Sequence, residues 1–229
     1  MNRPSTLVLL LSTAWLPASC SHGVGHSYFP LDKGAAWEYI VSYKVRGELR
    51  SQKRILSNGT AVEVDEQRYY PRTDLNGHRE FYQKTREGIV HVDPVSGEKT
   101  LVLKYPLEQG QQWQTQSRIR VLEVTGAFVP TFKARLVRPV AVTYHIEKTD
   151  DSVDVAAGTF NHCLRVHGKG RLFAGRTLQQ FMGIDSINID QTEWYAPGVG
   201  LVKTVREEYT EPNEFRNTYT RELQSYTRK

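Results

Sequence analysis

Apolar and polar side chains alternate along most of this 229-residue chain, in runs separated by turn residues. In the run that ends at Val45, for example, Tyr39, Val41 and Tyr43 would share one face of a strand. A period of two residues is typical of half-buried β-strands, because successive side chains point to opposite faces. The alternation therefore predicts an all-β protein with about a dozen antiparallel strands and little helix.

Turn signals divide the alternating runs. Asn-Gly pairs at 58–59 and 76–77 and the segment 94–97 are typical of hairpins, because Asn and Gly tolerate a positive φ. The segment 196–200 (Ala-Pro-Gly-Val-Gly) is a further tight connection. One helical turn is expected over 176–182. The later strands are expected at 113–124, 133–148, 160–172, 187–195, 200–209 and 215–227.

The pattern Pro-Leu-x-x-Gly-x-x-Trp occurs twice, at 30–37 and at 106–113. In each copy Pro and Gly bracket a turn, and the tryptophan opens the next strand. Trp37 and Trp113 either anchor the core or line the mouth of a pocket. The repeat predicts two sequence-similar halves within one sheet, near 28–104 and 105–229.

The N-terminus carries a signal for export. Leu7 to Leu16 is apolar apart from Ser12 and Thr13, and it is shorter than the roughly 20 residues that span a bilayer. Small residues then lead to Cys20, which resembles the lipobox of bacterial lipoproteins, although Pro17 stands where that motif usually has Leu. We expect a signal peptide over 1–19, a lipidated cysteine and tether over 20–27, and a single antiparallel β domain over 28–229. The alternative is ordinary cleavage that gives a soluble periplasmic or secreted protein.

Three segments carry a resemblance to a protein family. The segments 28–39, 157–160 and 194–203 resemble uncharacterised bacterial envelope lipoproteins described as TapB-like. The resemblance implies a strongly curved antiparallel sheet or a partly closed barrel, similar to the half-barrel of the lipoprotein carriers LolA and LolB. It also implies a concave apolar face that holds an acyl chain or a partner, and it supplies no catalytic residues.

The candidate ligand-binding residues are aromatic. Trp37 and Trp113 are expected near the concave face, together with Phe128 and Phe132 from the apolar connection 125–140. These two phenylalanines form either a lip beside a cavity or a plug in the open end of the barrel.

A basic face is expected on one strand. Arg165, His167, Lys169 and Arg171 recur at every second position, so they share a face; Arg118 and Arg120 repeat this spacing. Such a row of cations would bind lipid phosphates, anionic glycans or an acidic partner. The alternative is a solvated sheet face whose cations pair with acidic residues across the strands.

No group of residues predicts catalysis. His145, His162, Cys163 and His167 cannot converge on one strand face, so neither a metal nor another cofactor is expected. Ser96 and Lys99 have the spacing of acyl-serine enzymes but lie in a turn. The net charge of +5 and the export signal argue against nucleic-acid binding.

Taken together, the sequence predicts an exported lipoprotein that faces the periplasm, on the outer membrane if the cell has one. Its lipidated Cys20 binds the membrane, because several acyl chains hold a protein there firmly. The predicted activity is non-catalytic binding of a lipid-like or other apolar ligand. The alternative is a structural or interaction lipoprotein with a filled core, whose partner is another envelope protein.

Overall fold

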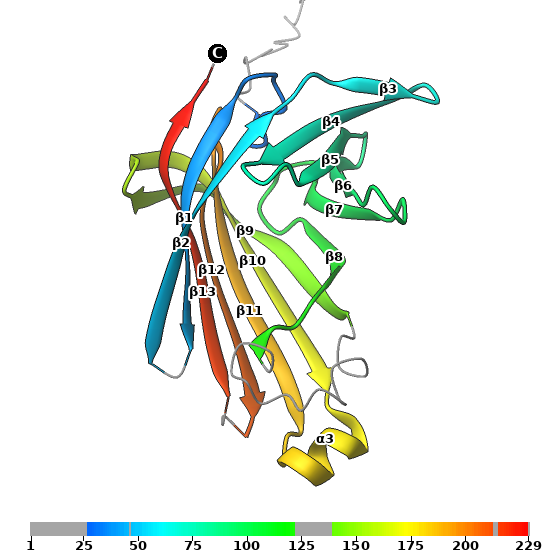
Figure 1. The fold of residues 1–229 in the computed structure, drawn as a ribbon, viewed down its shortest axis with the longest axis vertical. Coiled ribbons are helices and arrows are strands. Elements are labelled where there is room, and N and C mark those ends of the chain that lie inside the picture. Colours follow the sequence, from blue (N-terminus) through cyan, green and yellow to red (C-terminus); the bar gives the residue numbers. More distant parts are fainter. Residues whose placement is uncertain (1–26, 46, 122–138, 213–214, 229) are drawn as a thin grey trace, which may run out of the picture.

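The strands run up and down around a strongly curved sheet in the computed structural model, which describes residues 27–45, 47–121, 139–212 and 215–228 (Figure 1). All the ladders between these strands are antiparallel. The strands are β1 (Ala36–Val45), β2 (Glu48–Asn58), β3 (Val62–Val64), β4 (Gln67–Asp74), β5 (Arg79–Lys84), β6 (Gly88–Val92), β7 (Lys99–Lys104), β8 (Gln112–Ser117), β9 (Val140–Val155), β10 (Gly158–Phe173), β11 (Ser186–Ala196), β12 (Gly200–Glu211) and β13 (Arg216–Thr227).

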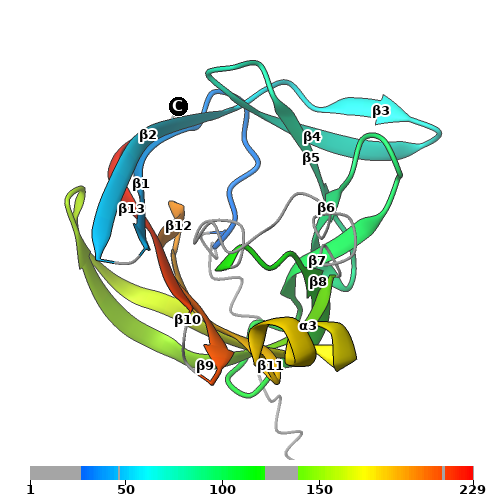
Figure 2. The same ribbon diagram turned by 60° about the horizontal axis from the view of Figure 1, so that its bottom comes forward.

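The sheet curls into a nearly closed barrel, seen end-on in Figure 2. The hydrogen-bonded order is β7-β6-β5-β4-β2-β1-β13-β12-β11-β10-β9-β8, and β3 pairs with β4 beside this path. The ladder between β1 and β13 joins the start of the described chain to its end. The edges β7 and β8 face each other without a ladder. The predicted all-β fold with a partly closed barrel is therefore confirmed.

Helix is scarce, as expected. Of the α-helices, α3 (Gly175–Met182) is the one whose bounds lie within the described segments, and it matches the turn predicted over 176–182. It ends at Gly183, whose left-handed conformation lets its N–H donate to the Gln179 carbonyl. No helix in this part of the chain is long and apolar enough to cross a membrane.

Three of the four predicted turns join neighbouring strands as expected: 76–77, 94–97 and 196–200. The prediction of a hairpin at 58–59 is wrong. Gly59 donates its N–H to the carbonyl of Pro71, and β2 pairs with β4 instead of β3. The hairpin turn of this region lies at Asp65 and Glu66, which both have positive φ, as a two-residue turn between antiparallel strands requires.

Two predicted strands have different bounds in the structure. β8 ends at Ser117 instead of residue 124, and β9 continues to Val155 instead of ending at 148. The extra length of β9 is a polar run that pairs with the start of β10, beyond the barrel wall (Figure 1). Pairing with a neighbouring strand can hold such a run extended where its local sequence does not demand it.

The two copies of the sequence repeat make the same backbone hydrogen bonds. Gly34 donates its N–H to the carbonyl of Asn58, which donates its own N–H back to the residue after the glycine. Gly110 and Ile146 repeat both bonds in the second copy. Each copy therefore fastens a turn to a neighbouring strand immediately before its tryptophan.

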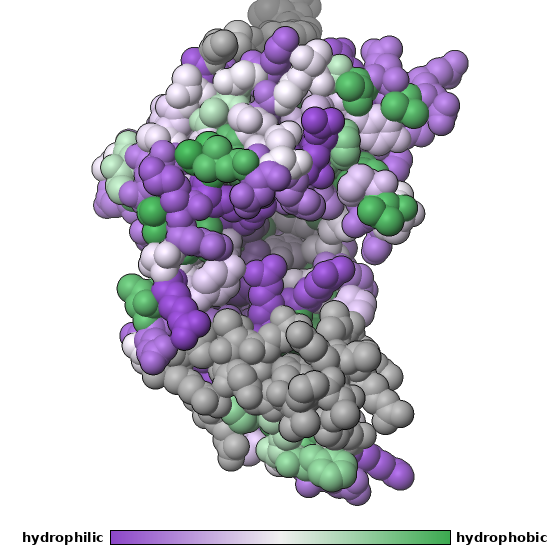
Figure 3. Space-filling view, viewed as in Figure 1, coloured by the Kyte–Doolittle hydropathy of each residue, from purple (hydrophilic) through white to green (hydrophobic). Residues whose placement is uncertain are grey.

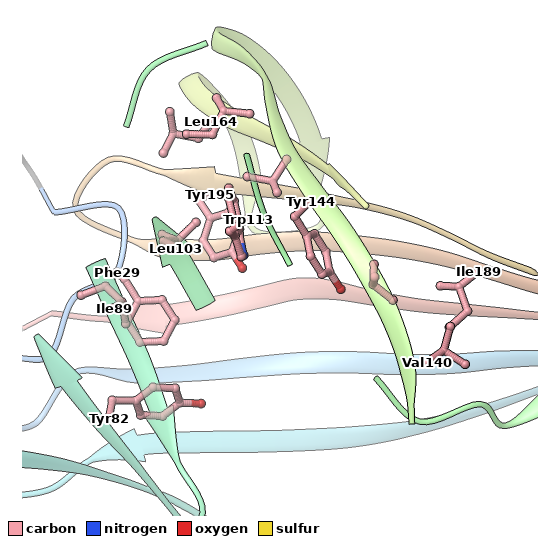
Figure 4. Close-up of a cluster of buried hydrophobic side chains, with 13 residues drawn as sticks. Phe29, Tyr82, Ile89, Leu103, Trp113, Val140, Tyr144, Leu164, Ile189 and Tyr195 are labelled. Atoms are coloured by element: carbon pink, nitrogen blue, oxygen red, sulfur yellow. The ribbon is translucent and has the colours of Figure 1, made fainter. Parts of the chain in front are cut away.

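Apolar side chains fill the part of the barrel that surrounds the two copies of the repeat. The largest buried cluster combines Phe29, Tyr82, Trp113, Tyr144 and Tyr195 with aliphatic residues from both halves of the chain (Figure 4). A second cluster surrounds Trp37 and Tyr39, and a third lies under α3. Burial of these side chains supplies the main driving force for folding.

The close packing of β6 against β7 leaves no room for a side chain at Gly88. Its φ is +147°, and a Cβ at this position would lie 1.9 Å from the carbonyl oxygen of Leu103. We expect Gly88→Ala to lower the free energy of unfolding by about 3 kcal/mol in urea denaturation. In the control Gly97→Ala, the φ of +70° also strains the backbone but no atom lies within 4 Å, so a loss of about 1 kcal/mol is expected. Equal losses would contradict the steric explanation.

Candidate functional site

The middle of the barrel interior is lined by polar side chains. On β13 they are Asn217, Tyr219 and Arg221 at alternate positions, followed by the buried Leu223. Directly opposite residues of an antiparallel ladder place their side chains on the same face, so the register extends this surface across β12, β11 and β1. We call the resulting set the polar belt: Tyr43, Gln191, Glu193, Thr204, Arg206, Glu208, Asn217, Tyr219 and Arg221.

The polar belt forms one wall of a cavity of about 380 Å³. This volume lies within the range of about 300–1,000 Å³ that is usual for small-molecule sites. The rest of the lining is Val41, Gln52, Arg54, Gln116, Ser117, Arg118 and Arg120, so a single aliphatic side chain faces this cavity. Figure 3 shows a hollow at mid-height on one side of the molecule, bordered by hydrophilic side chains.

Glu208 ties the segment after β8 to the barrel wall. The residue is 1% exposed, and one carboxylate oxygen accepts the backbone N–H groups of Arg120 and Val121, at 2.6 and 2.7 Å. The other oxygen forms an ion pair with Arg206 at 2.7 Å. Arg206 also donates to Ser117 Oγ and to the carbonyl of Arg118. Glu208 and Arg206 therefore hold the structure of the site, and their bonding capacity is largely used.

The carboxylate of Glu80, which is not part of the cavity lining, neutralises Arg54. Glu80 lies 3.2 Å from the Arg54 guanidinium and accepts the Tyr82 hydroxyl at 2.8 Å. Burial opposes the ionisation of Glu80, but these two contacts and the charges of His91 and Arg221 together outweigh it, and the pKa of Glu80 is lowered. Arg54 is thus a paired cation at the edge of the cavity.

Arg221 lies inside the barrel without such a partner. Its Nε donates to the Tyr219 hydroxyl at 2.9 Å, and its guanidinium lies 5.7 Å from the ring centre of Tyr39. Among residues 27–45, 47–121, 139–212 and 215–228, no carboxylate lies within 4.0 Å of it. Cations that are partly removed from water are usually paired, so the unpaired, half-buried Arg221 is unusual.

Two further polar groups in the lining have unused bonding capacity. Asn217 is 2% exposed, and its side-chain Oδ1 has no hydrogen-bond partner in the described part of the chain. Native structures leave few buried polar atoms in this state. Arg118 is exposed at the cavity rim, and its side chain forms no ion pair with any described residue.

Glu193 is the second carboxylate in the lining. It accepts hydrogen bonds from the Tyr195 hydroxyl at 2.8 Å and from Gln191 at 2.9 Å. Burial raises the pKa of Glu193, and these bonds with the charges of Arg221 and Arg206 only partly offset that effect.

The predicted tryptophans are core residues in the structure. Trp37 is 4% exposed, donates to the Val199 carbonyl at 2.7 Å and has the Arg72 guanidinium 4.4 Å from its ring centre. Trp113 is 6% exposed and stacks on Tyr144 with ring centres 5.7 Å apart. Neither lines the cavity of the polar belt. This placement agrees with the core alternative, and a ligand-binding role for the pair stays a prediction.

Three other predicted residues, Cys20, Phe128 and Phe132, lie outside the described residues.

The basic face of β10 is paired with carboxylates. Arg165 contacts Glu147 at 2.7 Å and Asp151 at 3.1 Å. His167 lies 2.8 Å from Asp190, which is also 3.9 Å from Lys169. Arg171 bonds to Glu211 at 2.5 Å. These contacts match the alternative of a sheet face with acidic partners across the strands.

Sequence reasoning missed the polar belt. Arg118 and Arg120 were singled out for their spacing, and the structure brings both to the cavity. The signal for β13 was the alternation of Asn217, Tyr219 and Arg221, but polar residues also occupy the other face of that strand. Alternation alone cannot say which of two polar faces points inward.

Comparisons with known proteins identify no function. No family model matches the sequence, and no curated protein matches it either. A predicted exported protein with a YmcC-like fold from Bacteroides fragilis is 13% identical, with a TM-score of 0.43 over 87% of this chain and 98% of that one. A predicted lipoprotein from Parabacteroides distasonis is 15% identical, with a TM-score of 0.41 and the same coverage.

Among the described residues, no group of three or more His, Cys, Asp or Glu could hold a metal ion.

Glu193→Gln is expected to raise the free energy of unfolding at pH 7 by about 1 kcal/mol, because it removes a charge that burial disfavours. The pKa of Glu193 is raised above 4.5 in the folded protein, so the folded state binds this proton more tightly than the unfolded chain does. The contribution of Glu193 to the free energy of unfolding therefore falls as the pH rises from 4.5 through the folded-state pKa of this group. The stability advantage of the Glu193→Gln variant shrinks as the pH is lowered toward 4.5.

Urea unfolding at several pH values checks this dependence. The control is Glu48→Gln, whose side chain is 75% exposed, and it is expected to change little at any pH. An advantage of Glu193→Gln that is the same at every pH would show that ionisation is not its cause.

Proposed function

We propose that this chain is an exported envelope lipoprotein that binds a polar small molecule inside its barrel and catalyses no reaction. The cavity of about 380 Å³ lined by the polar belt is the observation that carries the proposal. Proteins of this kind place a few polar groups around a pocket to orient one ligand.

The unused groups of the lining support a ligand. Filling the interior with apolar side chains would give a more stable barrel than a half-buried, unpaired Arg221 and an unbonded Asn217 Oδ1. Features that cost stability are common where a protein binds something. A ligand that bonds to these groups would compensate their burial.

The chemistry of the lining disfavours the apolar ligand expected from the sequence. An acyl chain in this cavity would remove water from Arg118 and Arg221 without replacing its hydrogen bonds, and it would leave Asn217 Oδ1 without a partner. The lining of this cavity therefore favours a polar ligand over the apolar ligand that the sequence predicts.

The non-catalytic part of the proposal rests on the two carboxylates of the lining. Glu208 is fully occupied by backbone N–H groups and by Arg206, while Glu193 accepts from Tyr195 and Gln191. Acid–base catalysis needs a carboxyl group within reach of a substrate proton. Both carboxyl groups here are engaged in holding their neighbours.

The envelope location rests on the N-terminal sequence. The apolar segment before Cys20 supports export, and the cysteine supports a lipid anchor on a membrane that faces the periplasm. The outer membrane is the proposed site in a cell that has one. An envelope protein is a further candidate partner.

The anchor is tested by intact-mass spectrometry of protein expressed with its own signal. The wild-type chain is expected to begin at Cys20 and to carry the added mass of acyl chains, whereas Cys20→Ala is expected to lack that mass and to lose stable membrane binding. Cys163→Ala is the control, because that buried thiol is expected to play no part in anchoring. An unmodified, soluble wild-type protein would contradict the anchor.

The ligand is tested by native mass spectrometry of gently purified protein. The wild-type chain is expected to carry a non-covalent polar compound, and Asn217→Leu is expected to lose at least tenfold of its occupancy without a lower melting temperature. Asn161→Leu is the control, because that exposed residue lies outside the cavity. Protein that carries no bound compound and that binds no added polar compound would contradict the proposal and favour an interaction protein with a filled core.

A further inference from the structure

The cavity carries an excess of positive charge. Its lining holds five arginines, and two of them are neutralised: Arg54 by Glu80 at 3.2 Å and Arg206 by Glu208 at 2.7 Å. The other three, Arg118, Arg120 and Arg221, form no ion pair with any residue that the structure describes. The interior of the barrel is therefore cationic before anything binds.

One carboxylate remains to offset these three cations. Glu193 feels the charge of Arg221, but it lies more than 4.0 Å away and bonds to Tyr195 and Gln191 instead. The charge of the cavity is thus not compensated from within.

Arg221 is held in place for a ligand. The Tyr219 hydroxyl accepts its Nε, the Tyr39 ring lies beside its guanidinium, and neither contact neutralises its charge. No described group accepts a hydrogen bond from its two terminal nitrogens. A guanidinium group presents these donors as a rigid fork, which matches the two oxygens of a carboxylate or a phosphate.

The surrounding groups fit an anion at this point. On the adjacent strands, Thr204 lies opposite Arg221 on one side and Val41 on the other, so neither neighbour supplies a competing negative charge. Arg120 donates to the Tyr43 hydroxyl at 3.2 Å, which places a second guanidinium in the same lining. Arg118 adds a third at the rim. Converging cations in a partly desolvated cavity raise the local concentration of anions.

We infer that the ligand of this cavity is a small oxyanion, with a carboxylate or phosphate group bound by the guanidinium of Arg221. The inference rests on the proposed binding function and names its chemical class. Arg118 and Arg120 add charge attraction, and the Asn217 carboxamide offers a hydrogen bond to a polar part of the same molecule.

Isothermal titration of the mature, detergent-solubilised protein with inorganic phosphate, citrate and choline tests the inference at fixed ionic strength. One of the two anions is expected to bind with one site per chain, and the cation choline is not. Comparing phosphate with citrate distinguishes the two head groups. Arg221→Met is expected to weaken binding at least tenfold, and Arg221→Lys to weaken it less, because lysine keeps the charge and loses the fork.

The matched control is Arg171→Met. Arg171 carries the same charge but lies on the exposed face of β10 and is paired with Glu211, so its loss is expected to leave anion binding unchanged. A melting temperature of Arg221→Met that equals or exceeds that of the wild type, without anion, would support a binding role. A structural arginine would instead lower it.

Each outcome decides between the two proposals. Equal losses in the Arg221 and Arg171 variants would overturn the inference, because they indicate unspecific charge attraction. A neutral polar compound bound to the purified protein, with neither anion binding, would overturn the inference and leave the binding function standing. The absence of both a co-purified compound and anion binding would overturn both.

Discussion

The antiparallel ladder between β1 and β13 is the contact on which the rest of the barrel depends. It joins the first described strand to the last, so the two halves of the chain share one interior. The same ladder places Tyr43 opposite Tyr219 and Val41 opposite Arg221. Because a shift of one residue would turn every side chain of β13 to the other face, this register both closes the barrel and decides which groups enter the cavity.

Apolar and polar parts of the interior follow one another along the strands and have different roles. Aromatic and aliphatic clusters at either end of the polar belt supply the apolar burial that a barrel of this size needs. Between them, Glu208 bonds to two backbone N–H groups and to Arg206, so even the polar middle contains a rigid part. Arg221 and Asn217 differ from these groups because the protein itself leaves their bonding incomplete. That contrast separates the groups that build the site from the groups that are proposed to use it.

Local sequence patterns were sufficient for the strands and for most turns. Alternation and turn residues predicted the barrel class, the short helix near Met182 and the connection at 196–200. They failed at 58–59, where the signal was correct for a turn but the next strand pairs elsewhere. The polar belt was beyond their reach, because its members come from four strands and meet only through long-range register. Trp37 and Trp113 were candidates because each ends a copy of the sequence repeat, although large aromatic residues more often fill a core than line a polar site.

The edges of β7 and β8 are not joined by a ladder, so the ring of strands is open along one line. Backbone hydrogen bonds fix the spacing of all the other neighbours around the described circumference, but at this seam the nearby bonds are made by the side chains of Lys104 and Gln111 (Figure 2). Widening the ring there breaks no ladder, so the girth of the barrel is set by side-chain packing at one line. A change in the volume of the barrel contents would therefore first change the spacing between β7 and β8.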